Sequence, residues 1–242
     1  MLKKVIIAEI TPSLPSKVPV ALYLVSKSRL STESTPPPIP FQPNLSVAYR
    51  LFKRSVDVLF SVLLLAVTLP LLIIVSIAIK VTSRGPIVLS QKRLTQGGEI
   101  FTLYKFRSMR QDAEKSTGAT LALKHDPRVT TIGKIIRKTR IDELPQLINV
   151  IKGEMSLIGP RPERPDIAQK LKESIPQFDR RLRAKAGLTG LAQVLQGYPE
   201  DERGYRRKLA LDMVYIQQQS ILLDIWISLK TVLVMVTGRG SR

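Results

Sequence analysis

The alternation of apolar and polar positions separates the chain into a polar start, one long apolar run and a mixed remainder. Residues 1–46 contain eight of the 17 prolines among serine and threonine, which predicts a disordered N-terminal extension. Residues 58–79 contain no charged side chain. As a straight helix these 22 residues would measure about 33 Å, close to the roughly 30 Å hydrocarbon core of a bilayer. The pattern therefore predicts a membrane helix.

Pro70 lies just past the middle of this apolar run, where it removes a backbone donor and clashes with the carbonyl of Ala66. We expect a bend there, with Thr68 or Ser61 satisfying the backbone groups that the bend frees. Both flanks of the run are basic: Lys53 and Arg54 before it, then Lys80, Arg84, Lys92 and Arg93 after it. Since neither side has the excess of positive charge, a re-entrant hairpin and a true span are equally favoured by the pattern alone. A buried helix of a soluble protein is the third alternative.

The remainder of the chain predicts a small domain of short strands and helices. We expect strands at 87–91 and 100–106, helices at 133–141 and 142–152 ending before Gly153, a stiff loop at 160–165, a helix at 166–185, a Gly-rich link at 187–190 and a helix at 205–236. The last helix mixes apolar residues with Asp212, Asp224 and Lys230, which is typical of an interfacial helix.

The predicted fold is therefore α+β and mostly helical. It comprises the N-terminal extension (1–46), a membrane segment (47–83) that forms either a helix-break-helix hairpin or a span, a small domain with short strands (84–204), and an interfacial helix region with a C-terminal tail (205–242).

Composition limits the chemistry that this domain can perform. With 38 Lys and Arg against 19 Asp and Glu, the formal charge is +19, which indicates a polyanionic partner. Nucleic acid, an anionic membrane surface and a phosphorylated substrate all fit, but 44% hydrophobic residues with only 5% aromatic residues favour the last two. No cysteine and a single histidine exclude thiol nucleophiles, disulfides and multi-histidine metal sites. Catalysis would depend on carboxylates, Lys, Arg, hydroxyls or an oxygen-bound cation.

Asp142 and Glu143 are adjacent carboxylates within a strongly basic stretch. On a helix their side chains diverge by about 100°, so they do not form a facing acid pair. They can still bind one divalent cation, because magnesium commonly takes one or two protein carboxylates and completes its shell with water and phosphate. The simpler interpretation of the pair alone is a helix N-terminal cap.

Four basic residues are candidate phosphate ligands around this pair: Lys105, Arg107, Arg137 and Arg161. Arg161 stands between two prolines, so its guanidinium would lose little entropy on gripping a phosphate. Each of the four taken singly is better explained as a solvated surface charge.

Five segments together resemble the bacterial sugar transferase family, the small monotopic phosphoglycosyl transferases. They are Lys53–Asp57, Lys105–Met109, Asp142–Leu147, Met155–Glu163 and Gly187–Val194, and the resemblance covers about residues 50–237. It implies transfer of a sugar phosphate from a nucleotide sugar, usually a UDP-sugar, to undecaprenyl phosphate with release of UMP, an early membrane step of exopolysaccharide, capsule, O-antigen or glycoprotein glycan assembly. The family places Asp142 as the nucleophile that forms a covalent phosphosugar intermediate, and Glu143 as its partner.

The same resemblance implies Mg²⁺ bound through Asp142, and substrate contacts from Lys105, Arg107, Arg137, Arg161 and Gln193. It also implies a re-entrant helix broken at Pro70, with the catalytic domain on the cytoplasmic face of the bacterial inner membrane among anionic phospholipids. This chain has Leu69 where the family often has serine, so Thr68 would take over that serine's role. No nucleic-acid partner is implied, and homo-oligomer formation is left open. The alternatives are a non-catalytic membrane adaptor and a nucleic-acid-binding protein.

Overall fold

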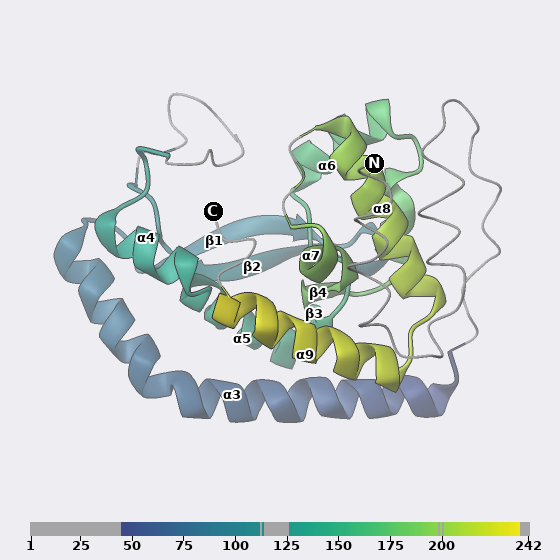
Figure 1. Ribbon diagram of the computed structural model, residues 1–242. Coiled ribbons are helices and arrows are strands. Elements are labelled where there is room, and N and C mark those ends of the chain that lie inside the picture. The colour runs from purple at the N-terminus through teal and green to yellow at the C-terminus, as the bar shows by residue number, and fades with distance from the viewer. Residues whose placement is uncertain (1–44, 112, 114–125, 198, 200, 238–242) are drawn as a thin grey trace. The chain divides into compact units, whose positions relative to one another are not determined.

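The computed structural model describes residues 45–111, 113, 126–197, 199 and 201–237, so nearly all of the predicted N-terminal extension lies outside it. The described elements, in which η denotes a 3-10 helix, follow in chain order (Figure 1): α3 (Val47–Thr82), β1 (Val88–Leu94), η2 (Gln96–Gly98), β2 (Ile100–Phe106), α4 (Thr131–Lys138), η3 (Ile141–Gln146), α5 (Leu147–Lys152), β3 (Met155–Ile158), α6 (Pro165–Ser174), η4 (Phe178–Arg183), β4 (Ala186–Thr189), α7 (Leu191–Leu195), α8 (Glu202–Gln217) and α9 (Ile221–Thr237). The prediction of a mostly helical chain with a few short strands is confirmed.

The apolar run forms α3, a single helix of 36 residues that contains Pro70. It begins where the Ser46 hydroxyl accepts a hydrogen bond from the amide of Tyr49 at 3.1 Å, and it bends in its second half (Figure 1). Among the described helices only α3 is long and apolar enough to cross a membrane. The chain therefore bends without the helix break that the hairpin prediction required, and re-entry into the membrane stays a prediction.

Thr68 lies two residues before Pro70, and its hydroxyl donates to the carbonyl of Leu64 at 2.7 Å. Pro70 frees a different carbonyl, that of Ala66, so Thr68 does not perform the expected repair. The Ser61 hydroxyl is buried and has no hydrogen-bond partner in the described part of the chain. A threonine bonded back to the carbonyl four residues earlier bends a helix, and Thr68 thus contributes to the bend beside Pro70.

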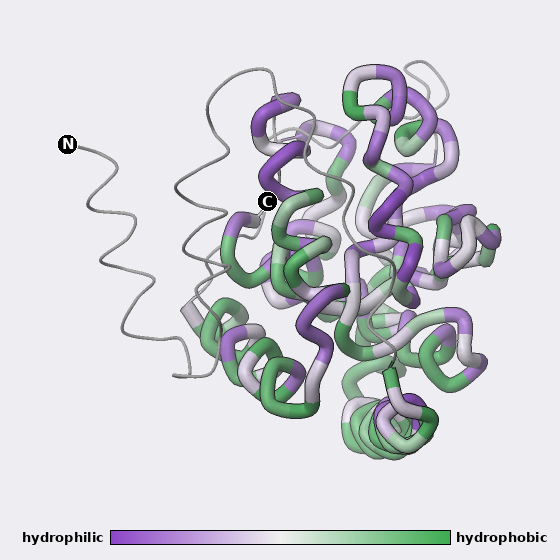
Figure 2. The backbone as a smooth tube through the Cα atoms, turned by 90° about the vertical axis from the view of Figure 1, so that its right-hand side faces the viewer, coloured by the Kyte–Doolittle hydropathy of each residue, from purple (hydrophilic) through white to green (hydrophobic). Residues whose placement is uncertain are grey.

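Both halves of α3 contact the same domain. In the first half, the Asp57 carboxylate accepts a hydrogen bond of 3.0 Å from the amide of Leu157 on β3. In the second half, Val75 and Ile79 form a buried cluster with Phe106 and Ile136. These two and Asp57 and Ser61 are the four buried residues of the helix. The rest of α3 exposes apolar side chains, and in Figure 2 the helix is seen end-on at the bottom, coloured mostly hydrophobic.

The first sheet is an antiparallel hairpin of β1 and β2, joined by the tight turn η2. β2 matches its predicted bounds, and β1 extends three residues beyond the predicted end at Gln91. Asn149 on α5 binds the backbone of β2, accepting from the amide of Tyr104 at 3.1 Å and donating to the carbonyl of Thr102 at 2.7 Å. This side-chain amide continues the hydrogen bonding of the sheet onto the helix that follows the acidic pair.

The second sheet is a parallel pair of β3 and β4 that the sequence did not predict. The expected Gly-rich link at 187–190 is in fact mainly strand β4. Its glycines permit a close backbone approach, because a Cβ atom on Gly187 would lie 2.1 Å from the amide nitrogen of Gly159. The pairing brings the loop after β3 next to the start of α7.

Two predicted helices are interrupted. The helix expected at 166–185 is α6 followed by η4, because Pro176 lies between them and cannot continue a helix. The helix expected at 205–236 is α8 followed by α9. α8 crosses the predicted boundary at 204/205 and buries half of its 16 residues, so it is part of the domain core rather than interfacial. α9 exposes most of its apolar side chains.

Candidate active site

The acidic pair, Asp142 and Glu143, lies in η3, which connects α4 to α5. Arg140 separates α4 from η3, and its φ of 60° is the only positive φ of a non-glycine residue among the described residues. This left-handed residue redirects the chain so that Asp142 is buried, with 8% of its surface exposed. The pair was expected in the first turn of a regular helix. It occupies a 3-10 turn that contains Pro145 instead, and the regular helix α5 begins only at Leu147.

Glu143 and Arg161 form the central ion pair of the site. The two terminal nitrogens of Arg161 reach the two carboxylate oxygens of Glu143 at 2.6 and 3.2 Å, which is the paired geometry that a guanidinium makes best. Arg140 approaches the same carboxylate at 3.7 Å. The carboxylate of Asp142, in contrast, forms no hydrogen bond or ion pair within the part of the chain that the structure describes.

The two carboxylates therefore differ in acidity. Burial and the adjacent Glu143 raise the pKa of Asp142 to about 6. Lys105, Arg161 and Arg137 oppose this rise, and their influence places all three cations near Asp142. Burial also acts to raise the pKa of Glu143, but the charge of Arg161 and its hydrogen bonds outweigh it, and the pKa is lowered. At neutral pH both groups are ionised, and of the two only Asp142 has no fixed partner among the residues that the structure describes.

Lys105 supplies positive charge from β2. Burial and the nearby cation of Arg93 lower the pKa of Lys105 to about 8, while Asp142 opposes the change. Arg93 was expected only as a basic flank of the membrane segment. It belongs to β1, where Nη2 donates to the side chain of Gln91 at 2.9 Å and Nη1 donates to the carbonyl of Pro162 at 3.2 Å.

The alternation of side chains along a β-strand could have placed Gln91 and Arg93 in this site. Lys105 is paired with Leu89, and Leu89, Gln91 and Arg93 share one face of β1. The prediction ended the strand at Gln91, so Arg93 was assigned to the basic flank and not to the site.

Two of the predicted substrate ligands have other partners. Arg107 is buried, and its Nη2 atom donates to the carbonyl and the hydroxyl of Ser83 at 2.8 and 2.7 Å, which caps the end of α3. Gln193 donates to the carbonyl of Leu188 at 3.1 Å and thereby holds the turn between β4 and α7. Lys105, Arg137 and Arg161 are the predicted basic residues that the structure brings together around the acidic pair.

A magnesium ion fits the residues present. Glu143 is committed to Arg161, whereas the Asp142 carboxylate has no protein partner among the described residues and is free to bind a cation. Groups of three or more acidic or histidine side chains that could form a complete protein cage do not occur in the described ranges. One carboxylate with water and phosphate oxygens is a common magnesium shell, so Asp142 is the residue that would hold it.

Comparison with known proteins decides the family. The model of the family described as bacterial sugar transferase matches residues 48–238. The chain belongs to this family. The resemblance predicted from the five segments is therefore confirmed, and the matched region begins at α3 and ends with α9.

Several curated members of the sugar transferase family resemble the chain. The UDP-N-acetylgalactosamine-undecaprenyl-phosphate N-acetylgalactosaminephosphotransferase of Aeromonas hydrophila is 43% identical over 197 residues, covering 81% of this chain and 46% of that protein. The UDP-glucose:undecaprenyl-phosphate glucose-1-phosphate transferase of Caulobacter vibrioides is 42% identical over 193 residues, covering 79% of this chain and 72% of that protein. The exopolysaccharide production protein PSS of Rhizobium leguminosarum bv. phaseoli is 38% identical, covering 78% of this chain and 97% of that protein. The chain thus spans about half the length of the Aeromonas relative.

Proposed function

We propose that the chain transfers a sugar 1-phosphate from a UDP-sugar to undecaprenyl phosphate, releasing UMP and initiating the assembly of an exopolysaccharide or related glycan. The observation that carries this proposal is the buried carboxylate of Asp142, which has no partner among the described residues and lies beside the Glu143–Arg161 ion pair and near Lys105 and Arg137. The names of the relatives supply the substrate classes, since they specify undecaprenyl phosphate and UDP-linked sugars.

In the first step a carboxylate oxygen of Asp142 attacks the phosphorus that bears the sugar. A bond from the carboxylate oxygen to this phosphorus forms, the bond between the same phosphorus and the bridging oxygen of the diphosphate breaks, and the bridging oxygen leaves on UMP. In the second step an oxygen of undecaprenyl phosphate attacks the same phosphorus, and the Asp142 carboxylate leaves. The products are the undecaprenyl diphosphosugar and the free enzyme.

The surrounding cations lower the repulsion between the attacking carboxylate and the diphosphate. Lys105, Arg137 and Arg161 all lie near enough to Asp142 to affect its pKa, so they also surround a phosphate bound against it. Bound magnesium would neutralise further charge on the diphosphate oxygens. Glu143 keeps Arg161 in place and leaves Asp142 as the carboxylate available to react.

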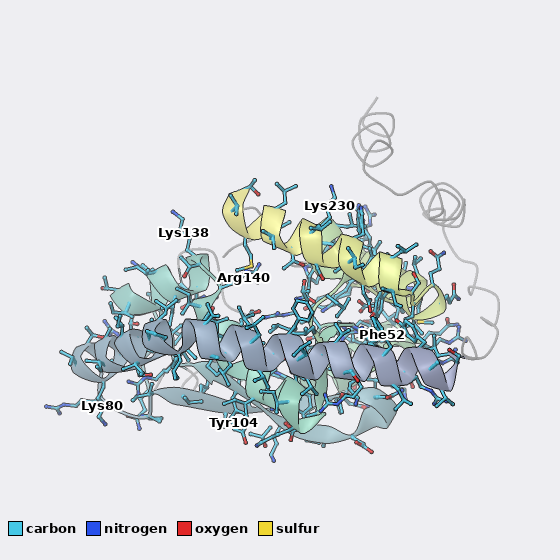
Figure 3. The ribbon with its side chains drawn as sticks, turned by 90° about the horizontal axis from the view of Figure 1, so that it is seen from below. Phe52, Lys80, Tyr104, Lys138, Arg140 and Lys230 are labelled. Atoms are coloured by element: carbon cyan, nitrogen blue, oxygen red, sulfur yellow. The ribbon has the colours of Figure 1, made fainter. Side chains whose placement is uncertain are left out.

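We place the protein on the cytoplasmic face of the bacterial inner membrane, and the contacts of α3 support the monotopic part of this proposal. A helix whose first half binds β3 and whose second half packs on β2 and α4 keeps both ends on the side of the domain. Lys80, Lys138 and Lys230 lie at the edges of the view in Figure 3, and basic side chains near a membrane surface attract anionic headgroups. The diphosphate of the UDP-sugar and the phosphate of undecaprenyl phosphate would then meet at the cytoplasmic surface.

The direct test is UMP release from a panel of UDP-sugars by detergent-solubilised protein with Mg²⁺ and undecaprenyl phosphate. We expect one or a few UDP-sugars to yield UMP, and EDTA to abolish the release. Asp142→Asn should lose activity, whereas Asp166→Asn, a change at an exposed carboxylate on α6, should keep it. If no UDP-sugar yields UMP, the transferase proposal fails and the membrane adaptor alternative takes its place.

A further inference from the structure

The loop that presents Arg161 is fixed by its own backbone. Each of its four consecutive carbonyls accepts one hydrogen bond: Pro160 from the Gly187 amide at 2.9 Å, Arg161 from Arg181 Nη2 at 2.6 Å, Pro162 from Arg93 Nη1 at 3.2 Å, and Glu163 from the Leu94 amide at 3.0 Å. The two prolines fix two further backbone angles. The group that donates to the carbonyl of Arg161 is the side chain of Arg181 in η4.

Arg181 belongs to a buried cluster of four charged side chains that the proposed chemistry does not use. Its Nε atom lies 2.8 Å from a carboxylate oxygen of Asp212, and the side chains of this pair are only 3% and 2% exposed. Its Nη1 atom lies 3.6 Å from Glu163, which also binds Lys208. The guanidinium is stacked 5.2 Å from the centre of the Phe178 ring. Two cations and two anions thus form a balanced group.

Stability does not explain such a cluster. Removing charges from water costs several kcal/mol for each ion, and replacing a buried ionic group by well-packed apolar side chains is often neutral or stabilising. Burial raises the pKa of Asp212 and lowers that of Lys208, which shows that the interior opposes both charges. What an ionic cluster supplies is one fixed geometry, here at the carbonyl of Arg161.

We propose that Arg181, oriented by Asp212, is a positioning residue for phosphoryl transfer: it holds the main chain of Arg161 so that the Arg161 guanidinium meets Glu143 beside Asp142. This inference rests on the proposed function. Arg181 donates to the loop on one side, and the Arg161 side chain leaves the same residue towards Glu143 on the other. Asp212 is one of the residues that orient Arg181, although it lies on α8, 51 residues after Arg161 in the sequence (212 − 161).

A displacement of Arg161 by as little as 1 Å is expected to matter, because misplacement on that scale can cost on the order of 100-fold in rate. Arg181→Lys keeps the charge but loses the planar fork that binds Asp212 and the Arg161 carbonyl together. We expect kcat for UMP release to fall at least about tenfold, with KM changing less than about threefold. Arg206→Lys is the matched control, since Arg206 pairs with the exposed Glu202 on the surface of α8.

A double-mutant cycle with Arg161→Ala decides between positioning and general destabilisation. If Arg181 acts through Arg161, Arg181→Lys should lower kcat less than about twofold further once Arg161 is alanine. Asp212→Asn keeps the shape of the side chain but removes the anion beside the buried guanidinium, so it should lower the melting temperature and, in the folded protein, reproduce the kcat loss of Arg181→Lys. If Arg181→Lys does not fold, Asp212→Asn takes its place in the cycle.

If the double variant loses as much kcat as the product of the losses in Arg181→Lys and Arg161→Ala, the two residues act independently and the positioning role is wrong. Full activity of both Arg181→Lys and Asp212→Asn would also overturn it. Absence of UMP release by the unaltered protein with every UDP-sugar would instead overturn the proposed function on which the inference rests. The two failures are therefore distinct.

Discussion

Lys53 forms an ion pair of 2.6 Å with Asp224, which joins the first part of α3 to the first turn of α9. The same carboxylate accepts a hydrogen bond from Tyr215 at 3.0 Å, and the Tyr215 hydroxyl also lies 3.0 Å from the carbonyl of Ile158 at the end of β3. From the sequence, Lys53 was counted among the basic residues that flank the membrane segment. The structure instead uses it to attach the apolar helix to the domain.

Lys53→Ala should destabilise the protein, because the partly buried Asp224 would lose its cation. We expect a loss of about 1–3 kcal/mol in the free energy of unfolding, visible as a lower melting temperature in detergent. Lys80→Ala, which removes an exposed lysine near the other end of α3, should leave the melting temperature unchanged. It should instead weaken binding to anionic vesicles about fivefold, from about 1 kcal/mol per basic residue near the surface. Equal melting temperatures for the two variants would refute the structural role of Lys53.

Arg161→Lys should impair catalysis while leaving the fold intact. Lysine keeps the positive charge but cannot bind both oxygens of Glu143, which Arg161 reaches at 2.6 and 3.2 Å. We expect kcat/KM for UMP release to fall at least about tenfold. Arg164→Lys is the neighbouring control, since Arg164 pairs with the half-exposed Asp166 outside the site. Equal activity of the two variants would show that the paired geometry is not needed.

The pH dependence of kcat/KM should be bell-shaped. Asp142 must be ionised to attack, and burial raises its pKa to about 6, so activity should fall as the pH drops through that value. Lys105 must be charged to bind phosphate, and burial lowers its pKa to about 8, so activity should fall as the pH rises past it. Lys105→Arg should abolish the alkaline limb and keep the acidic one, because arginine does not deprotonate in this range. An unchanged alkaline limb in this variant would assign that limb to another group.

Gly187→Ala should prevent correct folding. A Cβ atom at this position would lie 2.1 Å from the amide nitrogen of Gly159, between two backbones that cannot separate without breaking the pairing of β3 with β4. We expect loss of more than about 3 kcal/mol of stability and little soluble protein after detergent extraction. Gly97→Asn in the hairpin turn is the control, since no atom of the described residues lies within 4 Å of a Cβ there and asparagine tolerates its φ of 74°. Normal yield of the alanine variant would show that the strand pair is looser than described.

The elements that the sequence predicted well are those set by local pattern. α3 follows from an uninterrupted apolar run, and β2 follows from a short segment between turn residues. The pairing of β3 with β4 depends on contacts between segments about 30 residues apart and on glycines that allow the two backbones to approach closely. Local periodicity therefore does not predict it. Pro176 and the break after α8 were visible in the sequence, but the surrounding helical pattern outweighed them.

The site was predicted in part for the same reason. The motifs identified Asp142, Glu143 and Arg161, but a motif does not say which way a side chain points. Arg107 lies two residues after Lys105, and its Nη2 atom binds Ser83 at the end of α3. Arg181 and Asp212 belong to separate helices and meet only in the folded chain, so neither could be recognised as part of the support for Arg161.

The most direct test of the central claim is covalent capture on Asp142. Protein incubated with a UDP-sugar radiolabelled in the phosphate attached to the sugar, in the absence of undecaprenyl phosphate, should retain the label after acid quenching and gel filtration. Peptide mapping should locate the label on Asp142, Asp142→Asn should retain none, and adding undecaprenyl phosphate should discharge it into lipid. Label on any other residue, or full turnover by Asp142→Asn, would contradict the account.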